Sequence, residues 1–173
     1  ADGIEQRVHP CMVPLASPVA PVDGAVNAVV ADGDFVGRTV FEGMGAGAGP
    51  TASAVVGDLV DIARGQWTAP FGVATADFEV IPAADMAQHV GAYYVRLRVV
   101  DRPGVMADIA AILRDHAVSI ESVLQRGRDP DEAVSLIMTM HNTREAGMLA
   151  SLKTIEKLST VSEPPCMIRI EHV

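Results

Sequence analysis

The chain has 173 residues, of which 49% are apolar and 20% are charged, and its formal net charge is −9. This length is sufficient for one sizeable domain or two small ones. A net charge this negative argues against a nucleic-acid partner, which needs clustered Lys and Arg to replace phosphate counterions. No apolar run approaches the roughly 20 residues that span a bilayer. No basic start precedes an apolar segment either, so we expect neither a membrane span nor a signal peptide.

The two cysteines, Cys11 and Cys166, lie far apart in the sequence. We interpret them as reduced thiols of a cytoplasmic protein. No Cys/His cluster has zinc spacing, so we expect no metal site. The chain begins at Ala1, and a strand-like run follows almost at once. We therefore expect a fragment of a longer protein or an engineered polypeptide.

The first third of the chain predicts two kinds of β-structure. The run Ile4–His9 predicts a strand that ends at Pro10, because proline cannot continue the ladder of hydrogen bonds. Two further apolar runs, Ala25–Ala31 and Phe35–Glu42, flank the turn signal at 32–34. This pattern predicts a β-hairpin.

A helix over 50–64 is the next predicted element. Pro50 suits the first helical position, and Gly65 suits the residue just past the end. We expect one buried face, because apolar residues recur at helical spacing. These residues are Ala52, Val55, Val56, Leu59, Ile62 and Ala63. The stretch 66–90 has weak periodicity, and we interpret it as a linker with a short strand near Asp77–Ile81.

Residues 91–173 carry a second pattern of alternating strands and helices. The predicted elements are a strand over Tyr93–Val100, a loop over 101–104, a helix over Val105–His116, a strand over Ser119–Arg126, a turn at 128–131, a strand over Ala133–His141, a helix capped by Asn142 with Glu145 as its capping-box partner, and a strand over Cys166–Glu171. The order βαββαβ predicts a ferredoxin-like unit, in which two helices cover one face of a four-stranded antiparallel sheet. The fold class is therefore α+β.

The glycine-rich stretch 43–49 separates the predicted hairpin from the helix. It has glycine at every second position, so its backbone can approach an anion closely at a helix N-terminus. It is not a Rossmann fingerprint, because Ala48 stands where the third glycine would fall. No Gly-Lys-Ser/Thr ends it, so it is not a P-loop. From the spacing alone, a ligand contact is as good an interpretation as a flexible hinge or a tight helix–sheet contact that only glycine allows.

The run GMGAGAGPTASAVVGDLVD at 43–61 resembles a segment near the end of the catalytic region of homoserine dehydrogenases. The runs Arg7-Val8-His9-Pro10, Val22-Asp23-Gly24 and Asn27-Ala28-Val29 resemble the same family in the same order. The resemblance implies that residues 1–65 are the C-terminal part of the catalytic and dimerisation domain.

In that family the helix packs on a Rossmann domain, and the glycine turn contacts the nicotinamide end of the cofactor. The resemblance therefore implies that Gly45, Ala46 and Gly47 contact NAD(P), chiefly through their backbone. Met44 departs from the pattern, since the family usually has Arg or Pro there, so the detail of its contact is not carried over.

The second half, 91–173, resembles an ACT regulatory domain of the kind attached to bacterial homoserine dehydrogenases. The matching runs are YYVRL at 93–97, DRPGV at 101–105 and SIESVLQ at 119–125. The resemblance implies that L-threonine binds between paired ACT domains, in a homo-oligomer joined through the ACT and catalytic-domain sheets.

The residue chemistry is compatible with an amino-acid ligand. Pro103 and Gly104 form a turn before the helix that begins at Val105, whose first amides can hold a carboxylate. Asp101 could take the ammonium group, and Gln125 could hydrogen-bond the hydroxyl of threonine. A tight strand–helix connection without a ligand is the alternative interpretation.

Homoserine dehydrogenases reduce the aldehyde of L-aspartate 4-semialdehyde with NAD(P)H and use a lysine for proton transfer. The only lysines here, Lys153 and Lys157, lie on the last predicted helix. We expect the catalytic lysine upstream of Ala1. We therefore predict that this chain alone is inactive and binds no dinucleotide tightly. The alternatives are a free-standing ACT amino-acid sensor and an oligomerisation module without an enzymatic role.

Overall fold

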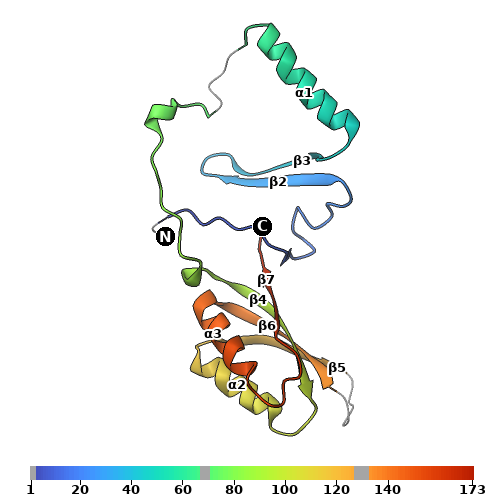
Figure 1. Ribbon diagram of the computed structural model, residues 1–173, viewed down its shortest axis with the longest axis vertical. Helices are drawn as coiled ribbons and strands as arrows, with labels where there is room; N and C mark the ends of the chain where they lie inside the picture. The colour runs from blue at the N-terminus through green and yellow to red at the C-terminus, as the bar shows by residue number, and fades with distance from the viewer. Residues whose placement is uncertain (1–2, 67–70, 127–132) are drawn as a thin grey trace. The chain divides into compact units, whose positions relative to one another are not determined.

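The computed structural model describes residues 3–66, 71–126 and 133–173 (Figure 1). Contacts divide the chain into two compact units. The first unit joins Ala1–Pro14 to Pro82–His172, and the second comprises Leu15–Ile81 with Val173. In the described ranges no helix is long and apolar enough to cross a membrane.

Residues 3–14 therefore pack with the C-terminal unit, a pairing that the sequence did not indicate. The assignment of 1–65 to the catalytic domain, 66–90 to a linker and 91–173 to the ACT domain stays a prediction. The predicted turn at 128–131 lies outside the described residues.

The first unit contains the predicted βαββαβ order. Its elements are β4 (Val90–Val100), α2 (Val105–Asp115), β5 (Ile120–Arg126), β6 (Ala133–Arg144), α3 (Glu145–Ile155) and β7 (Cys166–Ile170). Strand β1 (Cys11–Met12) adds a fifth strand, and the sheet order is β1-β7-β4-β6-β5. The β1–β7 pair is parallel and the other pairs are antiparallel. The α+β ferredoxin-like fold is thus confirmed, with one strand more than expected.

The core of this unit lies between one face of the sheet and the two helices. Because side chains alternate between the faces of a strand, β4 places Tyr93, Val95, Leu97 and Val99 in this core, all at most 3% exposed. The same alternation on β6 buries Val134, Leu136, Met138 and Met140. Helices α2 and α3 close the core with Ile109, Leu113, Met148 and Ile155. Each buried aliphatic side chain contributes roughly 1.5–3 kcal/mol to folding.

Two strands predicted from local patterns do not form. Of the run Ile4–His9, only Ile4 makes a bridge, to Ala83, and the pairing strand comes later at β1. This run is held by side-chain ion pairs, described below, and not by backbone pairing with a neighbouring strand. The predicted strand over Asp77–Ile81 is also wrong. The 3-10 turn η1 (Thr75–Asp77) ends where this strand was expected to begin, and a second 3-10 turn, η2 (Met86–Gln88), follows before β4.

The predicted capping box at Asn142 is wrong as well. Strand β6 continues through Arg144, which pairs with Val90, so Asn142 is a strand residue. Helix α3 begins at Glu145, with Arg144 in the N-cap position. The carboxylate of Glu145 binds Arg169 and does not return to a backbone amide.

The second unit consists of a hairpin and a helix. The hairpin is formed by β2 (Val26–Gly33) and β3 (Gly37–Met44), which confirms the prediction and places the three-residue turn at 34–36. Gly37 follows this turn with φ +71°, a conformation typical of three-residue hairpin loops.

Helix α1 (Ala48–Ala63) confirms the predicted helix and begins two residues earlier than expected. It ends in a Schellman motif. The amide of Gly65, at φ +70°, donates to Ile62 O, and that of Gln66 donates to Asp61 O. The expected burial of its apolar face does not occur within this structure, since no residue of α1 is buried.

Candidate functional site

The loop between β4 and α2 carries most of the predicted ligand residues. Gly104 is the N-cap of α2 and has φ +98°, a left-handed conformation that favours glycine. Pro103 and Gly104 are exposed, whereas Val105 is 6% exposed and anchors the loop in the core. The first hydrogen bond within the helix runs from Asp108 N to Gly104 O, at 3.0 Å.

This geometry leaves the first turn of α2 open to an acceptor. The amide of Val105 makes only a long 3.4 Å bond to Arg102 O. The amides of Met106 and Ala107 precede the first intrahelical bond, and a helix has no internal acceptor for them. Oriented N–H groups at a helix N-terminus favour a negative charge, as a carboxylate would supply.

The structure brings Asp101 and Gln125 into contact, although they are 24 residues apart. Gln125 Nε2 donates to Asp101 Oδ1 at 3.1 Å. Asp101 follows the end of β4 and Gln125 lies near the end of β5, and β6 separates these two strands in the sheet. The predicted ammonium and hydroxyl partners are therefore neighbours beside the open helix turn. Ligand binding by these residues remains a prediction.

The glycine turn lies between β3 and α1 and is exposed at all three predicted positions. The amide of Gly45 donates to Ala25 O at 2.9 Å, which ties the turn to the hairpin. A Cβ on Gly45 would lie 2.0 Å from Nδ2 of Asn27, so any side chain there would displace Asn27. Gly47 is the N-cap of α1 at φ +122°. Ala46 lies between these two glycines, and its cofactor contact also remains a prediction.

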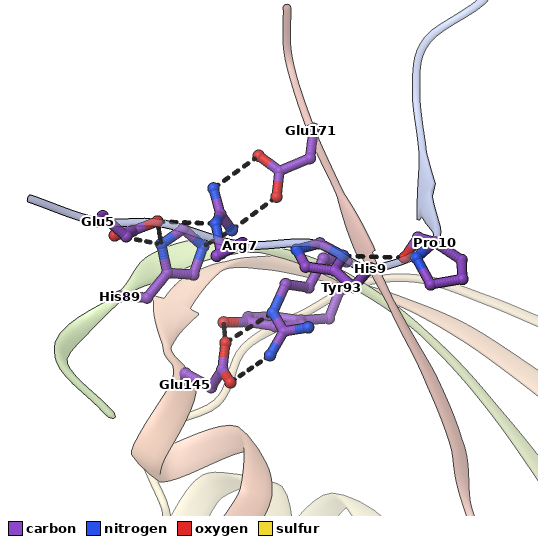
Figure 2. A network of polar contacts seen from close by, with 9 residues as sticks. Glu5, Arg7, His9, Pro10, His89, Tyr93, Glu145 and Glu171 are labelled. Carbon is purple, nitrogen blue, oxygen red and sulfur yellow. Dashed lines mark hydrogen bonds and ion pairs between the residues drawn. The ribbon is translucent and has the colours of Figure 1, made fainter. Parts of the chain in front are cut away.

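A network of charged side chains, shown in Figure 2, was missed by the sequence analysis. At its buried end, Arg169 Nε donates to Glu145 Oε2 at 2.8 Å, and a second bond joins Arg169 Nη2 to Oε1. Tyr93 Oη donates to the same carboxylate at 3.5 Å. Glu145 is 4% exposed and Tyr93 is fully buried.

Electrostatics within this network follow from burial and pairing. The hydrogen bonds from Arg169 lower the pKa of Glu145, and those bonds raise the pKa of Arg169 in return. Burial, with the nearby charge of Glu145, raises the pKa of Tyr93 to about 12. One signal in the sequence could have revealed the pair. Arg169 lies two residues after Met167 on β7, so both side chains point to the helix-covered face of the sheet. A charge on that face needs a partner.

The outer end of the network centres on Arg7. Its guanidinium donates to both carboxylate oxygens of Glu171, at 2.7 and 3.3 Å. Its Nε lies 2.9 Å from Glu5 Oε1, and its Nη1 lies 3.2 Å from Nε2 of His89. Among the described residues, no group of three or more His, Cys, Asp or Glu side chains could hold a metal ion.

Comparisons with known proteins first define the class of the C-terminal unit. Residues 93–160 match the family model of the ACT domain. The open helix turn, with Asp101 and Gln125 beside it, lies inside this match. The chain thus contains an ACT domain, as its sequence and its ferredoxin-like topology indicate.

Residues 1–60 match the family model of homoserine dehydrogenase. The chain is 39% identical over 171 residues to the homoserine dehydrogenase of Helicobacter pylori, covering 99% of this chain and 40% of that protein. It is 38% identical to the homoserine dehydrogenase of Neisseria gonorrhoeae, covering 99% and 41%. A crystal structure of a homoserine dehydrogenase from Thiobacillus denitrificans matches with a TM-score of 0.85 and 41% identity, covering 99% of this chain and 40% of that one.

The chain therefore corresponds to the C-terminal part of homoserine dehydrogenases, and it includes an ACT domain, as the motifs indicated. It spans about two fifths of the length of the curated relatives it matches.

Proposed function

We propose that this chain is the C-terminal part of a cytoplasmic, NAD(P)-dependent homoserine dehydrogenase. The intact enzyme would convert L-aspartate 4-semialdehyde to L-homoserine in threonine and methionine biosynthesis, and the ACT domain would sense L-threonine. The observation that carries the proposal is the match of both halves of the chain, in this order, to homoserine dehydrogenases.

The glycine turn fits a contact with the nicotinamide cofactor. Gly45 and Gly47 present no side chain, and the turn is exposed, so a planar ring could approach its backbone. The amides of Ala48 and Gly49 lie in the first turn of α1, where a helix offers no internal acceptor. When bound, NAD(P)H supplies the hydride. This chain would contribute part of the surface that positions the ring.

The chain alone is expected to lack dehydrogenase activity. Its only lysines, Lys153 and Lys157, are exposed and lie on or just after α3 in the ACT unit. Neither belongs to the unit that carries the glycine turn. Calorimetric titration with NADPH should give no micromolar binding to this chain.

The ACT loop supports an amino acid as the effector. The carboxylate would bind the amides at the start of α2, the ammonium group would bind Asp101, and the hydroxyl of threonine would bind Gln125. The contact of 3.1 Å between Asp101 and Gln125 places the last two partners together. A free amino acid needs such opposite charges at the two ends of a small site.

A second copy of the chain is the proposed partner of the ACT sheet. Strand β1 is two residues long and pairs with only Arg169 and Ile170 of β7, whereas the seven-residue β5 forms a long edge at the other end of the described sheet. Val123 and Leu124 on β5 are 45% and 44% exposed. An exposed edge with apolar side chains favours pairing with another strand. Two β5 edges could thus meet in a homodimer, in addition to pairing through the catalytic-domain sheets.

Thermal unfolding with added L-threonine tests the effector assignment. A ligand at 100 times its Kd stabilises the folded state by about 2.7 kcal/mol, so the Tm should rise by several degrees. Gln125→Ala should reduce this shift, and D-threonine, which presents the same groups in the wrong arrangement, should give little shift. A flat titration up to millimolar L-threonine would contradict threonine sensing.

A further inference from the structure

The polypeptide passes between the two compact units twice, after Pro14 and before Pro82. Residues 4–12, called the arm here, contact the chain at the second of these crossings. The amide of Ile4 donates to Pro82 O and the amide of Ala84 donates to Ile4 O, both at 2.9 Å. A Cβ on Gly3 would lie 2.7 Å from Pro82 O, so the backbones approach too closely for a side chain.

The other end of the arm is held by the last strand of the ACT unit. Cys11 and Met12 form β1, which pairs in parallel with β7. Met12 O accepts a hydrogen bond of 2.8 Å from the amide of Glu171. The arm therefore contacts two parts of the ACT unit. One end binds the segment at Pro82–Ala84, where the chain returns from the second unit, and the other end binds β7.

Arg7 lies between these two attachments and binds partners on both sides (Figure 2). It forms the two-bond ion pair with Glu171, directly after β7, and it contacts His89, directly before β4. A guanidinium only donates, so Nε2 of His89 accepts and its Nδ1–H donates to Oε2 of Glu5, at 3.2 Å. The side chain of His89 is 11% exposed and that of Arg7 is 22% exposed.

The same network reaches the first residue of α3. The amide of Glu145 donates to His89 O at 2.8 Å, and its carboxylate binds Arg169. Arg169 lies on β7, two residues before the partner of Arg7. A displacement of β7 or of the start of α3 would therefore move the groups that Arg7 binds.

We propose that the arm is a structural part of the ACT unit and that Arg7 is the positioning residue that fastens both chain crossings to it. The connection between the units is then a pair of anchored segments and not a single linker over 66–90. A change of conformation in the ACT unit reaches Leu15–Ile81 through both segments. The regulatory meaning of this coupling rests on the proposed function, whereas the attachment itself does not.

Hydrogen exchange measured residue by residue in the whole chain tests the attachment. The reporters are the amides of Ile4 and Ala84 at one crossing and of Glu171 at the other. In Arg7→Gln, all three should exchange at least about tenfold faster, whereas the amides of Val95 and Leu97 in β4 should keep their protection. Arg7→Lys keeps the charge but loses the two-bond geometry. Its exchange rates at the three reporters should lie between those of the unmodified chain and those of Arg7→Gln.

Arg114→Gln is the matched control, because Arg114 pairs with the neighbouring Asp115 while 74% exposed. It should change none of the three reporters. The proposal is overturned if Arg7→Gln leaves Ile4 and Ala84 protected, or if it accelerates β4 equally. Should the variant fail to fold, 1 M salt on the unmodified chain replaces it, because salt screens exposed and half-buried ion pairs. The same selective loss of protection at the reporters is then expected, and its absence overturns the proposal.

The intact dehydrogenase tests the coupling. Arg7→Gln should leave kcat and KM unchanged while raising the L-threonine concentration for half inhibition at least about tenfold. The Kd of threonine should stay within twofold, which a merely structural defect of the ligand site would not allow. Unchanged inhibition would overturn the coupling. If threonine does not inhibit the unmodified enzyme, the effector assignment fails, and the exchange result still decides the attachment.

Discussion

The two compact units of this chain differ in how they bury their apolar residues. The ACT unit has a closed core of aliphatic, aromatic and methionine side chains between its sheet and two helices. In Leu15–Ile81, by contrast, Ser17 is the one buried residue among those described. Helix α1 nevertheless carries a regular apolar stripe, with Leu59 60% exposed. Apolar residues at helical spacing are thus buried in the helices of the ACT unit and exposed in α1. The spacing determines which face of a helix is apolar, but that face is buried only where another surface packs against it.

The largest contrast between the units is expected from truncation of the ACT core. Leu97→Ala should lower the free energy of unfolding by about 3–4 kcal/mol, because Leu97 is fully buried on β4 and its loss leaves a cavity. Urea unfolding followed by far-ultraviolet circular dichroism measures this change. A loss below about 1 kcal/mol would mean that the core relaxes around the gap or is less closed than described.

The buried ion pair should give the next largest effect. Glu145→Gln removes one partner of Arg169 and should cost about 2–3 kcal/mol. This is below the usual 3–5 kcal/mol for breaking a buried pair, because the side chain of Arg169 is 20% exposed. The same urea titration measures it, and Glu156→Gln at an exposed position just after α3 is the control.

The pH dependence of that pair has a defined sign. Folding lowers the pKa of Glu145 from its ordinary 4.5. The pair therefore contributes its full stability above the unfolded pKa, and the contribution is lost as pH falls through the folded value. Unmodified chain should lose stability on acidification more steeply than Glu145→Gln between pH 5 and the acid limit of folding. Parallel curves would show that the carboxylate is not held in its charged form by Arg169.

A substitution at the end of α1 should have a smaller effect on stability, confined to the second unit. Gly65→Ala should weaken the last turn of α1 by about 1 kcal/mol, because alanine is strained at φ +70°. No neighbouring atom would meet the added Cβ, so the conformation alone causes the cost. Faster hydrogen exchange of the amides at 64–66, with the ACT amides unchanged, is the expected result. Equal acceleration of exchange in the ACT unit would show that the loss is not confined to the end of α1.

The smallest effect is expected where the stripe of α1 meets solvent. Leu59→Ala should change the stability of this chain by less than about 0.5 kcal/mol, as surface substitutions do. In the intact dehydrogenase the same substitution should cost about 2–5 kcal/mol if the stripe packs on the Rossmann domain, as for other buried leucines. Measuring both unfolding curves decides whether α1 is an interface helix or a surface helix.

Local signals in the sequence predicted the elements that local interactions determine. The hairpin, the end of α1 at Gly65 and the βαββαβ order were all predicted, because turn chemistry and periodicity act over a few residues. Asp101 and Gln125 were assigned to one site from their side-chain chemistry within the runs that resemble an ACT domain, and the structure brings them into contact.

Long-range pairing explains what the sequence did not predict. Ile4–His9 has the composition of a strand, but its place is decided by Glu171, which lies at the other end of the chain. Glu145 matched a capping box, yet Arg169 competes for its carboxylate with a full charge. Such competition between a local partner and a distant one is invisible in a short window of sequence.

The placement of β1 against β7 has a consequence for work on the ACT domain in isolation. A shorter polypeptide beginning at Pro82 would retain the helices and the apolar core, but Arg169 and Ile170 would lose their pairing with β1, so that all of β7 would be an unpaired edge. With β5 already open on the other side, such a polypeptide could add copies at both ends of its sheet. Aggregation on purification would then reflect a missing two-residue strand and not an unstable domain.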